Sequence, residues 1–354
     1  MEKLIFVFAI IIVLSTIFSV SPSRAITGHH RRFEGMISLI SYLILFYFSF
    51  NYGEFKDHYI KLFALSSSIM GLYGIFQYFN LKELILHGVF QWGYGAYATI
   101  GNRNFLGSYI TLFLPINIFL YIKYQKKMYL AWSCILFLCM LCTFTRSAWL
   151  AFVVYSIVLI KFIKNNKKHL KKCIKIYVVF IIISLSFNGI TQGALFNRQL
   201  SIIKDANNVI MEENADRSGS GRIFIWKRAV KLIPDRPLLG SGPDTFDLVF
   251  MKRFGKECGM NHHYDKAHNE YLQIAVTEGI PALVLYLIIV ISIVKGAYSR
   301  AKIEEEMIPI VLSLIGYLTQ AFFNISVVAV APIYWILLGY AAGIIFKNKK
   351  IIYD

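Results

Sequence analysis

Long apolar runs dominate the sequence, and a chain of this kind has few ways to fold. About 20 consecutive apolar residues cross the hydrocarbon core of a bilayer as a helix, because a helix satisfies its own backbone hydrogen bonds. Ten such runs are predicted to be transmembrane helices, near residues 4–20, 36–52, 59–79, 105–122, 128–145, 147–163, 173–190, 280–294, 307–324 and 327–346. The predicted fold class is therefore all-α, a polytopic transmembrane helical bundle of about ten spans.

The composition agrees with a membrane protein. Of the 354 residues, 57% are hydrophobic and only 16% are charged, whereas soluble domains carry about 25% charged residues. The first run follows a basic start, as a signal peptide would, but its exit, "SVSPSRAITG", shows no small-x-small cleavage pattern. We therefore treat residues 4–20 as a span.

Lysine residues gather in three segments between or after the runs. They are Lys123, Lys126 and Lys127; Lys161, Lys164, Lys167, Lys168, Lys171, Lys172 and Lys175; and Lys347, Lys349 and Lys350. With ten spans all three segments lie on one side, and the excess of positive charge indicates the cytoplasm. Topology thus explains the net charge of +17, and no nucleic-acid partner is implied.

One loop disagrees with this rule. Residues 21–35 carry Arg24, Arg31 and Arg32, yet the count of spans places them outside. Either the count is wrong near the start of the chain, or these arginines have a role on the outer side.

The predicted organisation has three parts: N-terminal transmembrane helices over 1–190, an extracytoplasmic helical loop over 191–267, and C-terminal transmembrane helices over 268–354. The loop holds 12 Lys/Arg and 9 Asp/Glu, and its apolar residues recur at helical spacing. The apolar residues of this predicted helix are Ile223, Trp226, Val230 and Ile233. Ser218 or Ser220 would cap it, and Pro234 and Pro237 would end it. A second short helix is predicted from Pro243 to Phe254. The five cysteines are interpreted as apolar filling, since only Cys258 lies in this loop.

His268 is the first candidate for chemistry. It lies in "KAHNEYLQIAVTEG" with Asn269 and Glu270, where the pattern predicts a helix that starts near His268 and stops at Gly279. A histidine at a helix N-terminus can be neutral near pH 7 and accept a proton. The alternative is an interfacial histidine with a structural hydrogen bond.

Arg146 is the second candidate, because it is the sole charged residue between Lys127 and Lys161. An ionisable residue in such a setting indicates function, and the planar guanidinium suits phosphate better than an ammonium group does. A snorkelling arginine at a tight turn is the alternative. Arg222, just after "SGSG", is a further candidate for anion binding, and the alternative is a solvated charge. Arg103, in "ATIGNRNFLGSY", is another candidate for anion binding, and the alternative is an interface anchor.

A metal site is a weaker hypothesis. "NHHYDKAH" contains His262, His263, Asp265 and His268, all of which are possible ligands. Their spacing matches none of the zinc or calcium patterns, so we expect no metal and no cofactor.

Four segments together carry a family resemblance. "GNRNFLGSYITLFLPI", "TFTRSAWLAF", "GRIFIWKRAVKLIPDRPLLGSGPDTF" and "KAHNEYLQIAVTEGIPALVLYL", in this order, resemble the O-antigen ligase/polymerase family of bacterial membrane glycosyltransferases. "SPSRAITGHHRRFEG" is also similar to an outer first loop of some members. The resemblance covers roughly residues 20–345 and would remove the conflict over the early arginines.

This resemblance implies a function. The donor would be a polyprenyl-diphosphate-linked glycan, the acceptor a glycan or lipid-linked glycan, and the transfer metal-independent, on the outer face of a bacterial cytoplasmic membrane and among its lipids. The family's essential residues match Arg146 and Arg222, expected at the diphosphate, and His268, expected to be the base. Arg103, Asn269 and Glu270 are possible substrate contacts.

Several alternatives stay open at this stage. Polymerase and ligase use the same donor chemistry and differ in the acceptor. A lipid-linked oligosaccharide flippase or other transporter is a rival, although the predicted spans are almost free of the charges that usually line a transport path. A metal-dependent membrane hydrolase that uses the cluster from His262 to His268 is a further rival.

Overall fold

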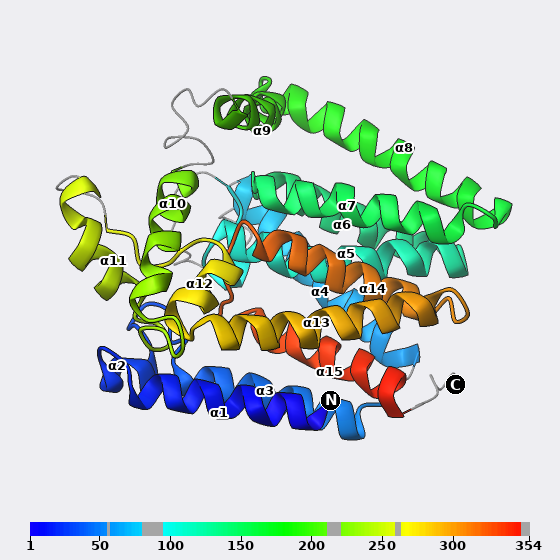
Figure 1. Ribbon diagram of the computed structural model, residues 1–354. Coiled ribbons are helices and arrows are strands. Elements are labelled where there is room, and N and C mark those ends of the chain that lie inside the picture. Colours follow the sequence, from blue (N-terminus) through cyan, green and yellow to red (C-terminus); the bar gives the residue numbers. More distant parts are fainter. Residues whose placement is uncertain (55–56, 80–94, 211–220, 259–262, 348–354) are drawn as a thin grey trace. The chain divides into compact units, whose positions relative to one another are not determined.

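The computed structural model describes the chain except for residues 55–56, 80–94, 211–220, 259–262 and 348–354, and within the described part it is helical without strands (Figure 1). The fold class predicted from the apolar runs is confirmed. The helices are α1 (Glu2–Ile17), α2 (Pro22–Thr27), α3 (Met36–Tyr52), α4 (Asp57–Tyr78), α5 (Arg103–Tyr124), α6 (Lys127–Cys142), α7 (Arg146–Ile163), α8 (Lys167–Ile190), α9 (Ala194–Ile210), α10 (Arg222–Leu232), α11 (Phe246–Phe254), α12 (Glu270–Thr277), α13 (Ile280–Ala301), α14 (Met307–Ala321) and α15 (Ala331–Lys347).

Each of the ten predicted runs coincides with a helix. Among the described residues, five helices are long and apolar enough to cross a membrane, namely α4, α5, α7, α8 and α13. Four shorter apolar helices, α3, α6, α14 and α15, accompany them. The chain is a multi-pass helical membrane protein.

The chain forms two compact units, which are described one at a time. We call the first the loop-bearing unit, composed of Met1–Gly53, Ile202–Gly296 and Ala321–Lys349. The second, the α5 unit, is composed mainly of Glu54–Ser201 and Ala297–Gln320. Each unit therefore joins segments that lie far apart in the sequence.

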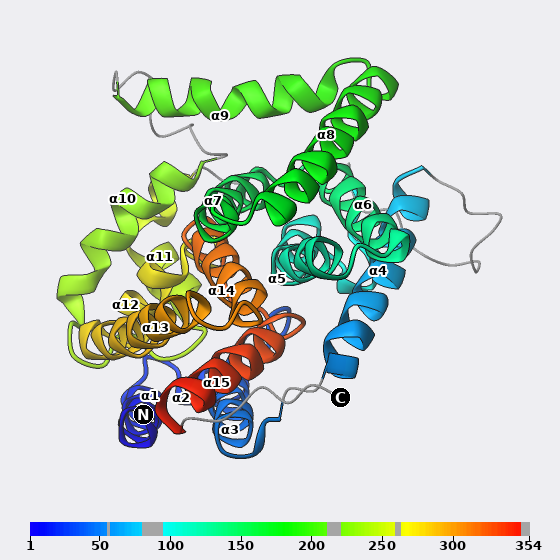
Figure 2. The ribbon, with the colours of Figure 1, turned by 90° about the vertical axis from the view of Figure 1, so that its right-hand side faces the viewer.

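The α5 unit is built around one helix. Figure 2 shows α5 almost end-on, with α4, α6, α7 and α14 around it. Every residue of α5 from Leu106 to Ile122 is buried, as expected of a helix that is apolar all round. Gly107 permits a close approach to α7, because a Cβ there would lie 3.0 Å from Cγ2 of Thr145.

In the loop-bearing unit, α1, α3 and α15 pack side by side (Figure 1). A Cβ at Gly339 in α15 would lie 2.4 Å from the backbone oxygen of Phe46 in α3, so only glycine allows the observed approach. Aromatic side chains fill the space between these helices, with Phe8 and Phe46 both against Trp335.

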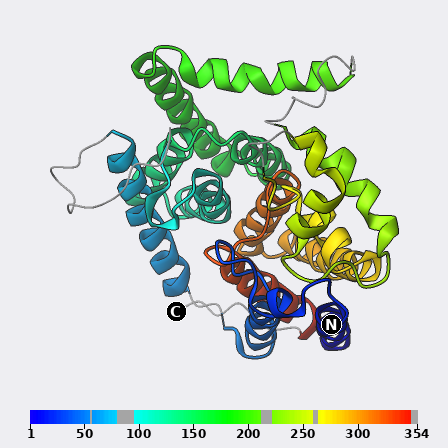
Figure 3. The same cartoon turned by 90° about the vertical axis from the view of Figure 1, so that its left-hand side faces the viewer.

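The large loop folds into helices, as its periodicity predicts, and Figure 3 shows α10 and α11 in yellow-green beside the yellow α12. The face of α10 that packs inward differs from the predicted one. Ile225, Ala229 and Leu232 are buried, whereas Val230 is 52% exposed. The reason is tertiary: the α10 face that is buried packs with Phe246, Phe250 and Phe254, three aromatic rings at helical spacing along α11.

Two further details of the loop differ or fall outside the described residues. The predicted helix after Pro243 begins at Phe246, because Asp244 has a φ of +57°, which a right-handed helix cannot include. Its end at Phe254 is as predicted. Ser218 and Ser220, considered as caps for α10, lie outside the described residues; Gly221 occupies the cap position.

Candidate active site

His268 lies just before the cap of a helix. The side-chain oxygen of Asn269 accepts a hydrogen bond from the backbone N–H of Leu272 at 3.0 Å, so Asn269 is the N-cap of α12. The helix stops at Thr277, and Gly279 has a φ of +94° that suits glycine. The helix predicted between His268 and Gly279 is therefore confirmed to within two residues at each end. The position places His268 near the positive end of α12.

The backbone on both sides of His268 is fixed by hydrogen bonds. The N–H of Ala267 donates to Oε1 of Gln273 at 2.9 Å, and the carbonyl of Ala267 accepts from Nε1 of Trp226 at 3.1 Å. Between these contacts and the Asn269 cap, His268 adopts a left-handed φ of +49°. Such a conformation costs a non-glycine residue about 1–2 kcal/mol. The surrounding contacts thus hold the imidazole in a position that an isolated chain would disfavour.

The imidazole of His268 is half-buried, and its Nδ1 has no hydrogen-bond partner among the described residues. Burial, followed by the positive charge of Arg222, lowers the pKa of His268 to about 4. Arg32 and Lys266 act in the same direction, and the carboxylate of Asp265 opposes them. The imidazole is therefore neutral at neutral pH and has a nitrogen lone pair available to accept a proton.

Arg222 is brought to His268 by the way α10 docks. It is the first residue of α10, one helical turn before Trp226, and residues four apart lie on one face of a helix. Because Trp226 contacts Ala267, the face that carries Arg222 is turned toward the segment of His268. The effect of Arg222 on the pKa of His268 agrees with this placement.

Arg32 is a second arginine near His268, and it comes from the first loop. It donates to one carboxylate oxygen of Asp265 from Nη2 at 2.6 Å and from Nε at 2.7 Å. Burial opposes ionisation of Asp265, but the charge and hydrogen bond of Arg32 outweigh it and lower the pKa of this carboxyl. Asp265 is thus an anion between Arg32 and His268.

Arg24 ties the same loop to the large loop. Its Nη2 lies 2.6 Å from Oδ1 of Asp247, and its Nε donates to the carbonyl of Asp244 at 3.1 Å. Residues 21–35 therefore pack on the large loop, and the two loops must lie on the same side of a membrane. Two of the three early arginines that disagree with the lysine rule, Arg24 and Arg32, thus have acidic partners in the large loop.

A buried cluster of ionisable side chains is composed of Glu34, Asp244 and Lys266, and Lys266 comes two residues before His268 in the sequence. Nζ of Lys266 is 2.8 Å from Oδ1 of Asp244 and 3.9 Å from Oε2 of Glu34. The other Asp244 oxygen accepts from the backbone N–H of His29 at 2.6 Å. Burial would neutralise these groups, but Lys266 lowers the pKa of Asp244, while Asp244 and Glu34 raise the pKa of Lys266. Lys266 and Asp244 are therefore a charged pair.

Glu270 and Asn269, predicted as possible substrate contacts, both make structural contacts. Oε2 of Glu270 accepts from the backbone N–H of Ser326 at 2.6 Å, which ties α12 to the segment before α15. Burial, and then the charge of Glu34, raise the pKa of Glu270 to about 7. Asn269 caps α12. A substrate role for either residue stays a prediction.

Arg146 and Arg103 form a separate group in the α5 unit. Arg146 is the first residue of α7 and Arg103 the first of α5. Oγ1 of Thr145 donates to the carbonyl of Arg103 at 3.1 Å, so the two helix N-termini meet. Arg146 is 9% exposed, and its Nη1 donates to Oγ of Ser201 at 2.9 Å. Two helix N-termini and two guanidinium groups together favour an anion.

The predicted metal-ligand cluster is only partly described, because His262 lies outside the described residues. Nε2 of His263 is 3.7 Å from Oδ2 of Asp247, and its side chain is 60% exposed. Asp265 is engaged by Arg32. Within the described part of the chain, no three His, Cys, Asp or Glu side chains are grouped so that they could hold a metal ion.

Arg32 and Lys266 are neighbours of His268 that sequence analysis did not propose as site residues. The available signal for Arg32 was the conflict between the arginines of residues 21–35 and the lysine rule. Lys266 gave no signal, because a single lysine in a polar loop is ordinarily a solvated charge.

Comparison with known proteins gives one family match. Residues 131–287 match the family model described as O-antigen ligase. The matched segment contains Arg146, Arg222 and His268, and it ends inside α13. A search of curated proteins found no match.

Proposed function

Because the chain carries an O-antigen ligase domain over residues 131–287, we propose that it is a membrane glycosyltransferase that moves a glycan from a polyprenyl-diphosphate carrier to a sugar hydroxyl of an acceptor. The match itself supports a glycosyl-transferring role of ligase type with a lipid-linked donor. The observation that carries the more specific proposal is the placement of a neutral, strained histidine beside Arg222 within this domain.

His268 is proposed as the general base. In the transfer, the acceptor hydroxyl oxygen attacks the anomeric carbon of the donor, and the bond from that carbon to the diphosphate oxygen breaks. The electron pair of that bond leaves with the diphosphate, and the hydroxyl proton goes to the imidazole. Positioned bases of this kind accelerate reactions by about 10²–10⁴-fold. A neutral imidazole is in the protonation state that the step needs.

Arg222 and Arg146 are proposed to bind the donor diphosphate. Negative charge builds on the leaving diphosphate, and charge-assisted hydrogen bonds from guanidinium groups stabilise it. For Arg222 the support is its position near His268. For Arg146 the support is its location at a buried helix N-terminus, together with the family resemblance.

Donor binding would also strengthen the base. Burial lowers the pKa of His268 most, and the positive charge of Arg222 lowers it further. A bound diphosphate would neutralise much of the Arg222 charge, so that part of the shift would be reversed and the pKa of the imidazole would rise. The histidine would then hold the proton better at the moment when the hydroxyl attacks.

The remaining features of the proposal follow from this chemistry. Attack from the face opposite the diphosphate inverts the anomeric centre. The diphosphate is already a good leaving group, and arginines stabilise its charge, so the transfer would proceed without a metal. The lysine distribution and the contact between residues 21–35 and the large loop support a site on the outer face of a bacterial cytoplasmic membrane.

The direct test uses the purified full-length protein with an isolated polyprenyl-diphosphate-linked glycan and an acceptor glycan. We expect release of polyprenyl diphosphate and appearance of the longer glycan, with the same rate in chelator. A rate that is lost in chelator and restored by a divalent ion would indicate the hydrolase rival. Movement of the lipid-linked donor across a bilayer without release of diphosphate would indicate a transporter.

A further inference from the structure

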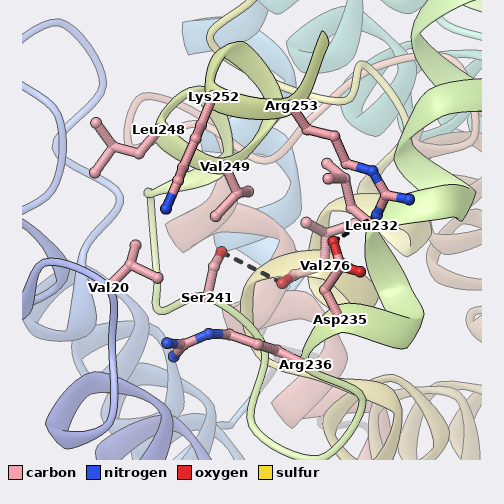
Figure 4. Close-up of a pocket in the computed structure, with 10 residues that line it drawn as sticks. All are labelled: Val20, Leu232, Asp235, Arg236, Ser241, Leu248, Val249, Lys252, Arg253 and Val276. Atoms are coloured by element: carbon pink, nitrogen blue, oxygen red, sulfur yellow. Dashed lines mark hydrogen bonds and ion pairs between the residues drawn. The ribbon is translucent and has the colours of Figure 1, made fainter.

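A pocket of about 600 Å³ lies in the loop-bearing unit, away from His268 (Figure 4). It is formed by the residues that follow α1, by the ends of α10 and α12, and by one face of α11. Its apolar walls are supplied by Val20, Leu232, Leu248, Val249 and Val276. A pocket with apolar walls and a few charged groups at this volume is typical of small-molecule sites.

Hydrogen bonds fix the wall between α1 and the large loop. The N–H of Val20 donates to the carbonyl of Ser241 at 2.9 Å, and Oγ of Ser19 donates to the same oxygen at 2.8 Å. Ser241 in turn donates through its N–H to the carbonyl of Val276 at 3.0 Å. The pocket is therefore part of the folded unit, because its lining segments are joined through backbone groups.

The pocket lies at the end of α1, which is the first span predicted from the sequence. From Phe6 onward, α1 and the residue after it expose an apolar surface composed of Phe6, Val7, Ile10, Val13, Leu14, Ile17 and Phe18. In a membrane protein such a surface is covered by acyl chains. Val20, which lines the pocket and is 40% exposed, comes directly after this surface. If α1 spans the bilayer as predicted, the pocket lies near the level where hydrocarbon gives way to headgroups.

The charges around the pocket are mostly positive. Asp235, the acidic residue of the lining, is paired with Arg253 at 2.6 Å. Arg236 donates from Nη1 to the carbonyl of Phe18 at 2.8 Å, which leaves the rest of its five N–H donors for other partners. Lys252 is exposed, and the described residues offer it no hydrogen bond or ion pair. In Figure 4 the charged groups of Lys252 and Arg236 lie on the Val20 side of the pocket, and Arg253 lies opposite with Asp235.

We propose that this pocket binds one acidic phospholipid of the surrounding bilayer. Its phosphate would lie between Lys252 and Arg236, and the beginning of its acyl chains would contact the apolar walls and α1. The lipid would hold α11 and the end of α10 against the membrane surface. The inference is independent of the proposed catalytic function.

The donor diphosphate is a poorer occupant than a phospholipid. His268 and Val276 are at opposite ends of α12, and a helical rise of about 1.5 Å per residue separates them by about 12 Å. A diphosphate in this pocket would leave the anomeric carbon beyond the reach of a hydroxyl bonded to His268. A structural lipid takes no part in the transfer, so its distance from His268 is not constrained.

The test measures lipid binding by the purified full-length protein in a neutral detergent, with native mass spectrometry as the readout. The probes are phosphatidylglycerol, phosphatidylcholine with the same acyl chains, and inorganic phosphate. We expect tight binding of one phosphatidylglycerol and weaker binding of the other two. Lys252→Gln and Arg236→Gln should each weaken phosphatidylglycerol binding about five-fold, the usual effect of one basic residue on an acidic lipid.

Lys256→Gln is the matched control, since Lys256 is exposed on the neighbouring turn and does not line the pocket. Equal binding of phosphatidylglycerol and phosphatidylcholine, or an equal effect of Lys256→Gln and Lys252→Gln, would overturn the proposal. Inorganic phosphate that binds as tightly as phosphatidylglycerol would show a bare anion site. Displacement of phosphatidylglycerol by an equal concentration of polyprenyl diphosphate would assign the pocket to the donor. Either of these last outcomes also rejects a phospholipid site.

Discussion

Nζ of Lys266 lies 2.8 Å from Oδ1 of Asp244, and the two side chains are only 3% and 1% exposed. The pair joins the segment that carries His268 to the turn before α11. Asp244 also accepts hydrogen bonds from the backbone of His29 and Glu34 in the first loop. Three segments that are distant in the sequence therefore meet at one buried ion pair, and the position of His268 depends on it.

We predict that Lys266→Met destabilises the protein by about 3–5 kcal/mol, because it leaves Asp244 buried without a cation. Unfolding of the purified protein in detergent, followed by circular dichroism, measures the change. Lys256→Met, at an exposed position, should change the free energy of unfolding by about 0.5 kcal/mol or less. The double variant Lys266→Met/Asp244→Asn should lose less than the sum of the single variants. An unfolding free energy for Lys266→Met that equals the control would refute the role given to the ion pair.

Glu270→Gln tests a second buried acid, Glu270, through the pH dependence of the free energy of unfolding. Burial and the charge of Glu34 raise the pKa of Glu270 to about 7 in the folded chain, from an ordinary value near 4.5. Between these values the unfolded chain releases a proton that the folded chain keeps, so the wild type loses stability as the pH rises. Glutamine keeps the acceptor for Ser326 N–H and cannot ionise.

The variant should therefore match the wild type below pH 4.5, gain stability relative to it from pH 4.5 to 7, and keep that gain above pH 7. The expected gain is on the order of 3 kcal/mol. It is measured as the difference between the two unfolding curves at each pH. A difference that is constant over the whole range would show that Glu270 is not held in its neutral form.

The sequence alone predicts the helical elements well, for a physical reason. A helix that crosses a bilayer must be apolar over its length, so α5 or α13 can be recognised without knowledge of its neighbours. Asn269 and Gly279 likewise mark the ends of α12 through local chemistry. The predicted site residues His268, Arg146 and Arg222 stand out as polar residues of special type near such elements, although their roles stay proposals.

Tertiary contacts account for what the sequence could not predict. The buried face of α10 is selected by the phenylalanine side chains of α11, which no periodicity within α10 reveals. The left-handed Asp244, which delays the start of α11, is stabilised by contacts with the first loop. Arg32 and Asp265 pair across most of the chain. Each case depends on segments that meet only after folding.

Topology gives a prediction that can be tested in cells. Because Arg24 and Arg32 bind acids of the large loop, residues 21–35 and 191–267 should be labelled from the same side. The lysine rule makes this the outer side. A membrane-impermeant thiol reagent should modify Asn214→Cys in intact cells and should modify Lys168→Cys only after lysis. The reverse pattern would invert the membrane orientation.

Arg146→Lys should lower transfer at least ten-fold while the protein folds normally. Lysine keeps the charge but lacks the planar fork that pairs with two phosphate oxygens. The rate per folded molecule and the apparent affinity for the donor should be measured together. Lys161→Arg, at an exposed position in the last turn of the same helix, is the control for surface charge. Normal transfer by Arg146→Lys would reduce this residue to an anchor for α7.

His268 is the residue on which the proposed mechanism depends, and we predict that His268→Ala lowers the transfer rate about 10²-fold or more. Donor binding should change little, because the arginines, and not the imidazole, are assigned to the diphosphate.

Alanine tolerates the φ of +49° at this position no better than histidine does, so a second variant is needed. Asparagine adopts left-handed conformations readily. His268→Asn should therefore fold at least as well as the wild type and still lack the base. His263→Ala should keep near-normal transfer, because the side chain of His263 is 60% exposed.

Three quantities are measured for each variant: the amount of folded protein in detergent, the affinity for the donor, and the transfer rate per folded molecule. A structural role for His268 predicts lost folding with a normal rate per folded molecule, whereas a role as base predicts normal folding with a lost rate. A well-folded His268→Asn protein that transfers at the normal rate would remove the base from the mechanism, while the family match over residues 131–287 would stand.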